Sequence, residues 1–186
     1  MNQTDTQQLV RTYDVDASHS TVEFKVRHLG FSKVTGRFTK FDASVEMEPG
    51  DLSTLQVEAS VDVRSIETGD AKRDEHLRSE DFFAGETHPT MQFTSTGVTR
   101  VSGNEFTLAG DLTIRGTTRP VEIHGTYLGQ ATDPWGASRI AIEGTTRINR
   151  EDFGLTWNQT LETGGLLVSK EVEIALEVQG VQRSED

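Results

Sequence analysis

Hydrophobic and polar residues alternate along most of the chain. Six segments show this pattern most clearly: 21–27, 55–63, 106–114, 121–127, 140–148 and 172–178. Because successive side chains of a β-strand point to opposite faces, each segment would have one apolar and one polar face as a strand. Parallel strands buried on both faces carry continuous apolar runs instead, so the pattern predicts an antiparallel sheet. Many such strands in one chain are typical of a sandwich or a barrel.

The segments between these strands are rich in turn-forming residues. Ser-Gly-Asn at 102–104 separates two strands at hairpin distance, and Glu-Pro-Gly-Asp at 48–51 and Asp-Pro-Trp-Gly at 133–136 have turn compositions. Several predicted strands run for about nine to thirteen residues, against a usual length near five or six. Long strands in a small closed sheet favour an up-and-down barrel over a sandwich. We therefore predict an all-β chain that folds as one antiparallel barrel.

Three glycines fall on the apolar face near the middle of a predicted strand, namely Gly110, Gly125 and Gly144. A missing side chain lets a sheet coil tightly, and it also leaves space inside a barrel for a ligand. Both interpretations follow from the absent Cβ atom and stay open here.

Residues 68–83 lack the alternation. Asp70 is a favourable N-cap for a short helix there, and Leu77 is the only large apolar side chain of that helix before Phe82. The segment is therefore predicted to be a helical crossover or lid lying against the sheet. After Pro89 the alternation resumes, with Met91 pointing inward.

The length of 186 residues fits one domain. We expect a barrel domain at 12–181 between a flexible segment at 1–11 and a tail at 182–186. With 30 acidic and 18 basic residues the net charge is −12, which is typical of an acidic protein surface and argues against nucleic-acid binding. The same charge weakens the case for docking on anionic lipid head groups.

The N-terminus has neither the basic region nor the apolar core of a secretory signal. No apolar run approaches the roughly 20 residues of a membrane span. We therefore expect a cytoplasmic protein without a membrane span. The absence of Cys excludes disulfides and thiolate metal sites.

The sequence contains no recognisable catalytic arrangement. The five His residues form neither an H-x-H pair nor an H-E-x-x-H motif, and there is no G-x-S-x-G elbow, P-loop or dinucleotide fingerprint. We therefore predict a protein that is not an enzyme, has no metal site and requires no cofactor.

Inward-pointing apolar residues are the remaining candidates for function, because small-molecule pockets are lined by such groups. A barrel of about eight strands is either filled by its own side chains or holds one ligand, and alternation does not choose between the two. The positions predicted to face the interior and line a binding site are Val22, Phe24, Val26, Phe38, Val57, Val61, Leu77, Phe82, Met91, Phe93, Phe106, Leu108, Leu112, Ile123, Tyr127, Ile140, Ile142, Trp157, Ile174 and Leu176.

Several motifs in order along the chain resemble a known family. They are 13–20 (YDVDASHS), 22–28 (VEFKVRH), 36–41 (GRFTKF), 65–68 (SIET), 73–83 (RDEHLRSEDFF), 89–93 (PTMQF), 112–121 (LTIRGTTRPV) and 148–155 (INREDFGL). Together they resemble the YceI-like family of bacterial polyisoprenoid-binding proteins. The resemblance implies a lipocalin-like barrel of eight antiparallel strands with a helical crossover. It also implies an elongated apolar pore for an isoprenoid chain, such as that of a quinone or a polyprenyl lipid, and a possible homodimer.

Three charged residues in these motifs, Arg73, His76 and Arg150, are candidates for the rim of the pore. They either tie the crossover to the barrel or contact a ligand head group. Because an unpaired buried charge is costly, we expect Arg73 to have a carboxylate partner such as Asp74 or Asp81, and Arg150 to be held in a similar way.

The preferred functional interpretation is a carrier or sequestering protein for a long isoprenoid amphiphile. Two alternatives remain: a stress-related structural or interaction barrel with a side-chain-filled core, and an enzyme acting on a quinone or lipid head group at the rim.

Overall fold

Residues 9–184 are described by the structure, a computed structural model. Of the two predicted terminal segments, residues 1–8 and 185–186 lie outside the described part. The strands are β1 Arg11–Val15, β2 Thr21–His28, β3 Ser32–Phe38, β4 Phe41–Glu48, β5 Asp51–Asp62, β6 Ile66–Glu67, β7 Thr90–Ser102, β8 Glu105–Ile114, β9 Thr117–Thr132, β10 Ser138–Asn149 and β11 Glu171–Gln182. The helix α1 is Ala71–Arg78, and the short 3₁₀ helices are η1 Ala17–His19, η2 Val63–Ser65 and η3 Arg150–Phe153.

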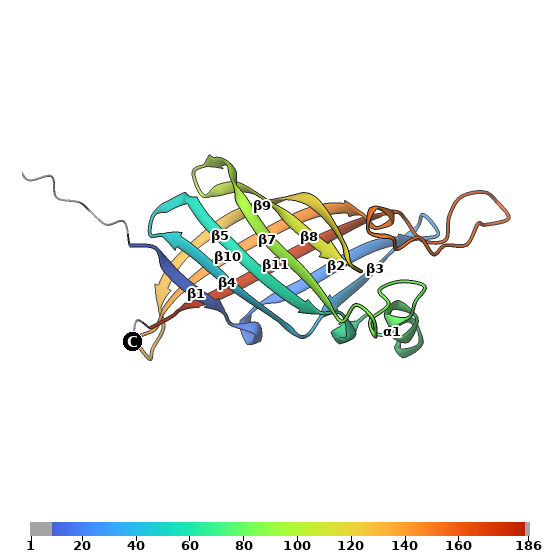
Figure 1. The fold of residues 1–186 in the computed structure, drawn as a ribbon, viewed down its shortest axis with the longest axis horizontal. Helices are drawn as coiled ribbons and strands as arrows, with labels where there is room; N and C mark the ends of the chain where they lie inside the picture. Colours follow the sequence, from blue (N-terminus) through green and yellow to red (C-terminus); the bar gives the residue numbers. More distant parts are fainter. Residues whose placement is uncertain (1–8, 185–186) are drawn as a thin grey trace, which may run out of the picture.

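The strands form one antiparallel sheet that closes on itself. Its order is β1-β4-β5-β7-β8-β9-β10-β11, and the pairing of β1 with β11 completes a ring of eight strands. This confirms the predicted all-β barrel, including the strand number and the short helical crossover. The barrel is elongated, with α1 at one end and the start of β1 at the other (Figure 1).

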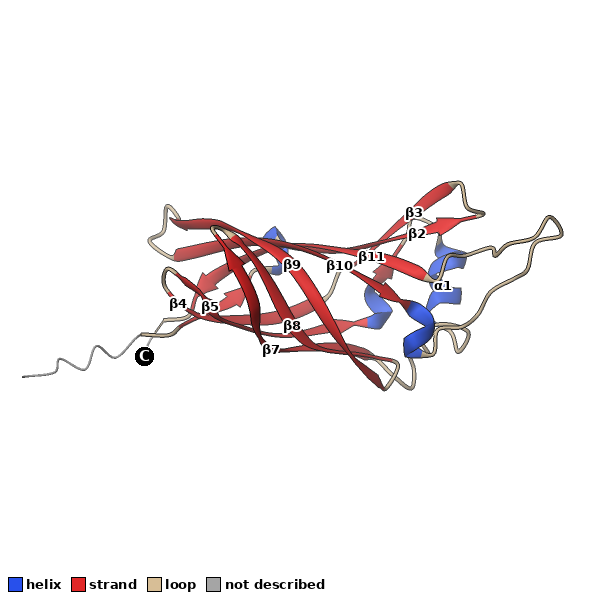
Figure 2. Cartoon of the chain, turned by 90° about the horizontal axis from the view of Figure 1, so that it is seen from above, coloured by secondary structure: helices blue, strands red, loops and turns tan. Residues whose placement is uncertain are grey.

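Strands β2, β3 and β6 prolong the barrel wall at the end that carries α1. The short helix η1 interrupts the extended chain between β1 and β2. As a result, β11 pairs with β1 near Gly180 and with β2 from Glu173 to Glu177. β2 and β3 then run out as a hairpin beside β6 (Figure 2). We call this end of the molecule the helix end.

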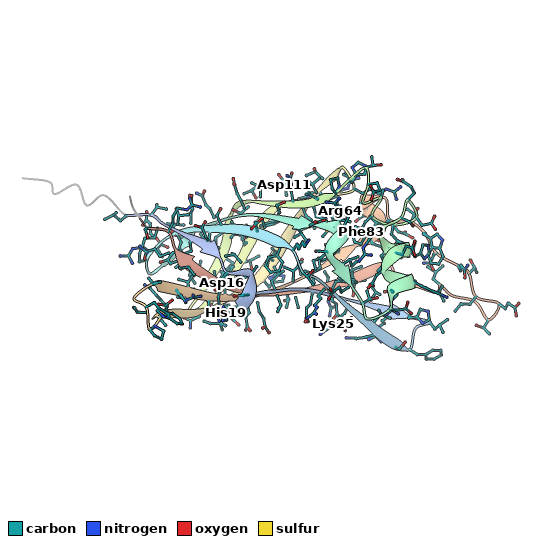
Figure 3. All side chains as sticks on the ribbon, turned by 90° about the horizontal axis from the view of Figure 1, so that it is seen from below. Asp16, His19, Lys25, Arg64, Phe83 and Asp111 are labelled. Atoms are coloured by element: carbon teal, nitrogen blue, oxygen red, sulfur yellow. The ribbon has the colours of Figure 1, made fainter. Side chains whose placement is uncertain are left out.

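The break at η1 is held by a charged network. Asp16 caps η1 through the Ser18 amide and lies beside His19 (Figure 3). Arg139 on β10 donates to Asp16 Oδ2 and to Asp133 Oδ2, each at 2.9 Å. The hydrogen bond from Arg139, followed by those from Ser18 and His19, holds the pKa of Asp16 far below its usual value. The network therefore fixes the point where the chain passes from the ring to the prolonged wall.

The helix begins as predicted, with Asp70 accepting from the amides of Lys72 and Arg73. Its only buried residue is Asp74, whose Oδ1 accepts from the amide and the hydroxyl of Thr68. The helix is thus held by polar contacts with the preceding segment as well as by Leu77, which reaches the barrel interior.

Two of the mid-strand glycines accommodate aromatic rings. A Cβ atom at Gly125 would lie 2.2 Å from Cζ of Phe106, and one at Gly110 would lie 2.4 Å from Cζ of Phe93. The interpretation as ligand space is therefore wrong at these two positions, because neighbouring rings occupy the space. Gly144 differs, since it lies in the wall of an internal cavity.

The core consists of two clusters along the barrel axis. The first contains the fully buried Tyr13, Met47, Leu55 and Ile140, contributed by β1, β4, β5 and β10. We call the part of the barrel around these four residues the packed end. The second cluster, with Phe38, Ile66, Phe82 and Phe153 among its members, lies at the helix end.

Candidate functional site

The barrel encloses an elongated cavity of about 440 Å³. Its wall extends from Val45 and Val178, next to the packed end, to Val26, Val34 and Val168 at the helix end. The volume lies within the range of about 300–1,000 Å³ that is typical of ligand pockets. Side chains therefore leave part of the interior open, as the interpretation as a ligand-binding barrel requires.

Alternation predicted the wall of this cavity well. Every predicted lining residue except Tyr127 and Ile140 contributes to it, including Leu77, Phe82 and Trp157 from outside the strands. Whether these side chains contact a ligand stays a prediction. The wall is made almost wholly of aliphatic and aromatic side chains, so it offers an apolar ligand burial without many polar contacts.

The two exceptions lie in the packed end of the barrel. Ile140 is buried in the cluster around Tyr13, and Tyr127 packs against the same cluster. The pairing of β9 with β10 shifts register between Ala141 and Ile142, so that Ile142 pairs with Tyr127. The prediction that Tyr127 and Ile140 line the cavity is therefore wrong, because side chains fill the barrel interior at the packed end.

Several lining residues were not singled out from the sequence. They are Val15, Val34, Phe41, Ala43, Val45, Leu55, Ala59, Ile114, Val121, Ile148, Phe153, Leu155, Leu167, Val168, Val172 and Val178. Some of them, such as Val172 and Val178, continue the alternation that identified Ile174 and Leu176. That signal could have found them. Leu167 and Val168 come from a loop without periodicity and had no such signal.

Polar side chains from the α1 region also reach the cavity wall, namely Thr68, Arg73 and His76. Arg73 donates from Nε to Thr68 Oγ1 at 2.7 Å and from Nη2 to the Thr68 carbonyl at 2.8 Å. The prediction of a carboxylate partner for Arg73 is therefore wrong. The hydroxyl and the carbonyl oxygen of Thr68 accept its hydrogen bonds instead. Asp74 accepts from Thr68 on the other side, so one threonine links the two charged residues.

His76 lies between α1 and the loop that follows η3. Its Nε2 is 2.8 Å from Asp81 Oδ2, and its ring stands edge-on to Trp157 and to Phe82, with centroid separations of 4.7 and 5.1 Å. His76 thus connects two aromatic side chains of the cavity wall, Phe82 and Trp157, to the carboxylate of Asp81.

Arg150 is buried and holds the base of the same loop. Its guanidinium donates to the carbonyl oxygens of Leu155, Trp157, Val168 and Ser169, with distances from 2.6 to 3.4 Å. Burial lowers the pKa of Arg150 from its usual value. Carbonyl oxygens replace the expected carboxylate partner. The contacts place Arg150 as a structural support for Trp157, and each of its three guanidinium nitrogens is hydrogen-bonded although the side chain reaches the cavity wall.

The barrel wall is thin where β9 and β10 separate. Their pairing ends at His124 and Thr145, and beyond it the Thr146 hydroxyl bonds the Glu122 carbonyl at 2.7 Å. An outer depression of about 840 Å³ begins there. Residues that line both this depression and the internal cavity are Glu23, Phe24, Val121, Thr146, Ile148, Phe153 and Ile174.

Residues 9–184 lack two features that would bear on function. They contain no group of three or more His, Cys, Asp or Glu side chains placed to hold a metal ion. No helix within them is long and apolar enough to cross a membrane.

Comparisons with known protein sequences find clear relatives. The YceI-like domain matches residues 13–180. A UPF0312 protein of Vibrio cholerae is 37% identical over 170 residues, which cover 91% of this chain and 86% of that protein. A UPF0312 protein of Pseudomonas aeruginosa is 36% identical over 170 residues, covering 91% of this chain and 85% of that protein.

Solved structures share the fold. BcnA from Burkholderia cenocepacia superimposes with a TM-score of 0.78 at 24% identity, covering 89% of this chain and 98% of BcnA. The YceI protein of Campylobacter jejuni gives 0.74 at 25% identity, covering 86% and 91%. A polyisoprenoid-binding domain from Saccharophagus degradans gives 0.66 at 15% identity, covering 92% and 98%.

Proposed function

The chain belongs to the YceI-like family, and we propose that its barrel binds a long isoprenoid amphiphile, such as a quinone or a polyprenyl lipid, and carries or sequesters it. The observation that carries this proposal is the elongated apolar cavity inside the barrel. A relative of the same fold bears the name of a polyisoprenoid-binding domain, which supports the class of ligand.

The cavity offers binding energy without any special chemical group. Burial of one methylene contributes about 0.8 kcal/mol, so one five-carbon isoprenoid unit contributes roughly 3–4 kcal/mol before ordering costs. Ordering of the chain removes much of this gain. Several buried units still leave about −8 to −12 kcal/mol, which corresponds to micromolar to nanomolar affinity. We therefore expect the lipid to remain bound during purification.

The polar lining indicates how such a ligand would be oriented. Thr68, Arg73 and His76 come from one region at the helix end, whereas the wall beside the packed end is formed by Val15, Val45 and similar side chains. An amphiphile with its polar group near α1 and its chain towards the packed end would leave few polar groups unpaired.

The direct test is native mass spectrometry of freshly purified protein, followed by organic extraction of any bound lipid. We expect a stoichiometric adduct that extraction identifies as an isoprenoid species. A clean apo mass from several expression hosts, with no uptake of added quinone, would contradict the proposal and favour an interaction barrel without a lipid ligand.

A matched pair of variants makes this test specific to the cavity. Ala59 lies in the cavity wall on β5, whereas Ala141 on β10 alternates with Ile140 and Ile142 and does not line the cavity. Ala59→Phe should reduce bound lipid by at least about tenfold, because the new ring takes the place of roughly two or more buried methylenes. Ala141→Phe should leave the lipid content unchanged.

Two further properties stay predictions. A cytoplasmic location is tested by cell fractionation, and a homodimer by the mass of the particle in solution. Neither affects the test of lipid binding, since the cavity is enclosed by one chain.

A further inference from the structure

Basic residues gather in one part of this acidic protein. Between Glu23 and Asp42 the sequence contains Lys25, Arg27, Lys33, Arg37 and Lys40 but no acidic residue, although the whole chain carries a net charge of −12. These residues belong to or follow the hairpin of β2 and β3, which projects at the helix end (Figure 2). The hairpin is therefore basic, and of its charges Lys33 and Arg37 form ion pairs with Glu173 and Glu67.

The hairpin ends in an apolar turn. Leu29 and Gly30 both have left-handed backbone angles, with φ of 55° and 72°, and the Phe31 amide bonds the His28 carbonyl at 3.1 Å. Turns of this kind favour Asn-Gly, because asparagine tolerates the left-handed region better than leucine does. Leu29 nevertheless occupies it with 38% of its surface exposed, and Phe31 is 86% exposed. The fold alone gives no reason for two apolar side chains at this position.

A second projection lies beside the hairpin. The loop that follows η3 is joined to the hairpin by the hydrogen bond from Leu29 N to the Leu167 carbonyl at 2.9 Å, and by the one from Ser169 N to the Arg27 carbonyl. Leu166 in this loop is 39% exposed. Both projections extend at the same end of the barrel (Figures 1 and 2). We call Leu29, Phe31 and Leu166 the apolar tip.

The apolar tip continues the wall of the internal cavity. Val26, His28 and Val34 on the hairpin line the cavity, and Leu167 and Val168 do so on the loop. Apolar side chains thus lead from the exposed tip into the barrel. A lipid chain that entered between the projections would meet few polar groups on its way.

Basic residues lie along the hairpin behind the apolar tip, with Arg27 paired to Lys33 next to the turn and Lys25 paired to Thr35 further from it. Lys25 and Arg27 alternate with the inward Phe24 and Val26, and Lys25 lies on the outer surface (Figure 3). Within the described part of the chain neither forms an ion pair, whereas Lys33 lies 3.6 Å from Glu173. The projecting loop adds Glu162 and Lys170, whose charges balance.

We propose that the helix end docks on the surface of a lipid bilayer with anionic head groups, with the apolar tip inserted and Lys25 and Arg27 against the head groups. Exposed apolar side chains flanked by basic ones are typical of proteins that bind at this interface. Salt screens charges over about 8–10 Å, so the charges nearest the apolar tip matter most for docking, and those on the hairpin are basic. The inference rests on the proposed function in one respect: docking places the cavity mouth where an isoprenoid lipid resides.

The experiment is flotation of the purified protein with vesicles of phosphatidylcholine alone or mixed with phosphatidylserine. We expect binding to the mixed vesicles that falls in high salt. Phe31→Ser should weaken it by about tenfold or more, because the phenylalanine ring that would insert into the bilayer is lost. Lys25→Gln with Arg27→Gln should weaken it by about 25-fold, at roughly fivefold for each charge.

Two variants separate docking from folding. Leu29→Asn places a preferred residue in the left-handed turn, so it should leave the melting temperature unchanged or raise it while weakening vesicle binding. Trp135 is 87% exposed in the β9–β10 turn, away from the helix end. Trp135→Ser should not change vesicle binding. Equal losses for Trp135→Ser and Phe31→Ser would overturn the proposal.

Uptake of quinone from detergent micelles distinguishes this proposal from the proposed function. Wild-type protein that takes up quinone from micelles but does not float would overturn docking alone. Equal binding to both vesicle types in high salt would show a neutral bilayer as partner and contradict the role of the basic residues. A change in the mass of the particle with Phe31→Ser, without vesicle binding, would assign the tip to contact between two copies.

Discussion

The two ends of the barrel use the same kind of residue in different ways. At the packed end, Tyr13, Met47 and Ile140 are fully buried in one cluster and do not line the cavity. At the helix end, Phe24, Val26 and Trp157 line an open cavity, and Phe31 is exposed beyond it. Because filled interiors contribute most to stability, the comparison indicates that stability is concentrated at the packed end and ligand binding towards the helix end.

The largest expected effect tests this division with two isoleucines on one strand. Ile140 and Ile142 face the same side of β10, but Ile140 is buried at the packed end while Ile142 lines the cavity. Ile140→Ala should lower the free energy of unfolding by about 2–5 kcal/mol, as large-to-small core substitutions do. Ile142→Ala should cost less, because its side chain already borders open space. Urea denaturation of the two variants measures the difference.

The same pair also separates stability from binding. Ile142→Ala should change the affinity for an isoprenoid ligand, whereas folded Ile140→Ala should bind as the wild type does. Equal loss of stability in the two variants would show that the cavity wall is packed as tightly as the packed end.

A somewhat smaller effect is expected at the glycines that accommodate rings. Gly125→Ala would place its Cβ atom 2.2 Å from Cζ of Phe106, so the ring must move. We expect a loss of about 1–3 kcal/mol, the usual cost of overpacking a core. Phe106→Leu should reduce the penalty of Gly125→Ala in a double-mutant cycle, because the ring that clashes is then absent. Additive effects in thermal denaturation would contradict this explanation.

The sequence predicted the sheet and its inward face because both depend on a local period of two. It did not predict how far along the barrel the interior is filled. Ile140 and Ile142 are equivalent in the pattern, and only the pairing of β1 with β11 and the register shift at Ala141 make their surroundings different. These contacts join residues far apart in the chain.

The sequence pattern also did not predict the hydrogen-bond partners of the charged residues. Carboxylates adjacent in sequence were expected to pair with Arg73 and Arg150, yet carbonyl oxygens and the Thr68 hydroxyl serve instead. Backbone acceptors are present at every residue, so a motif does not reveal which of them a folded loop will present. The apolar tip was not predicted either, because the alternation of a strand gives no information on the side chains of a turn or a loop.

The junction between the packed end and β2 should depend on pH. Hydrogen bonds from Arg139, Ser18 and His19 lower the pKa of Asp16, and Arg139 also lowers that of Asp133. A carboxylate whose pKa is depressed in the folded state contributes stability above its unfolded pKa, near 3.9, and loses it as pH falls further. Asp16→Asn should therefore be less stable than the wild type at neutral pH, by about 1 kcal/mol.

The difference between the two proteins should shrink as the pH falls below about 4, because the wild-type carboxylate becomes protonated. Chemical denaturation between neutral pH and the acid range measures it. A constant difference across this range would mean that Asp16 acts through its shape and not through its charge.

The smallest effect concerns the hydroxyl group of Tyr13 in the packed end. Tyr13 is fully buried, and within residues 9–184 its hydroxyl has no hydrogen-bond partner. A buried hydroxyl without a partner costs free energy, whereas removing it leaves the ring and its packing in place. Tyr13→Phe should therefore keep the stability within about 1 kcal/mol of the wild type, on the stabilising side. A clear loss of stability would show that the hydroxyl makes a contact, and the packed end would then be less purely apolar than the cavity beside it.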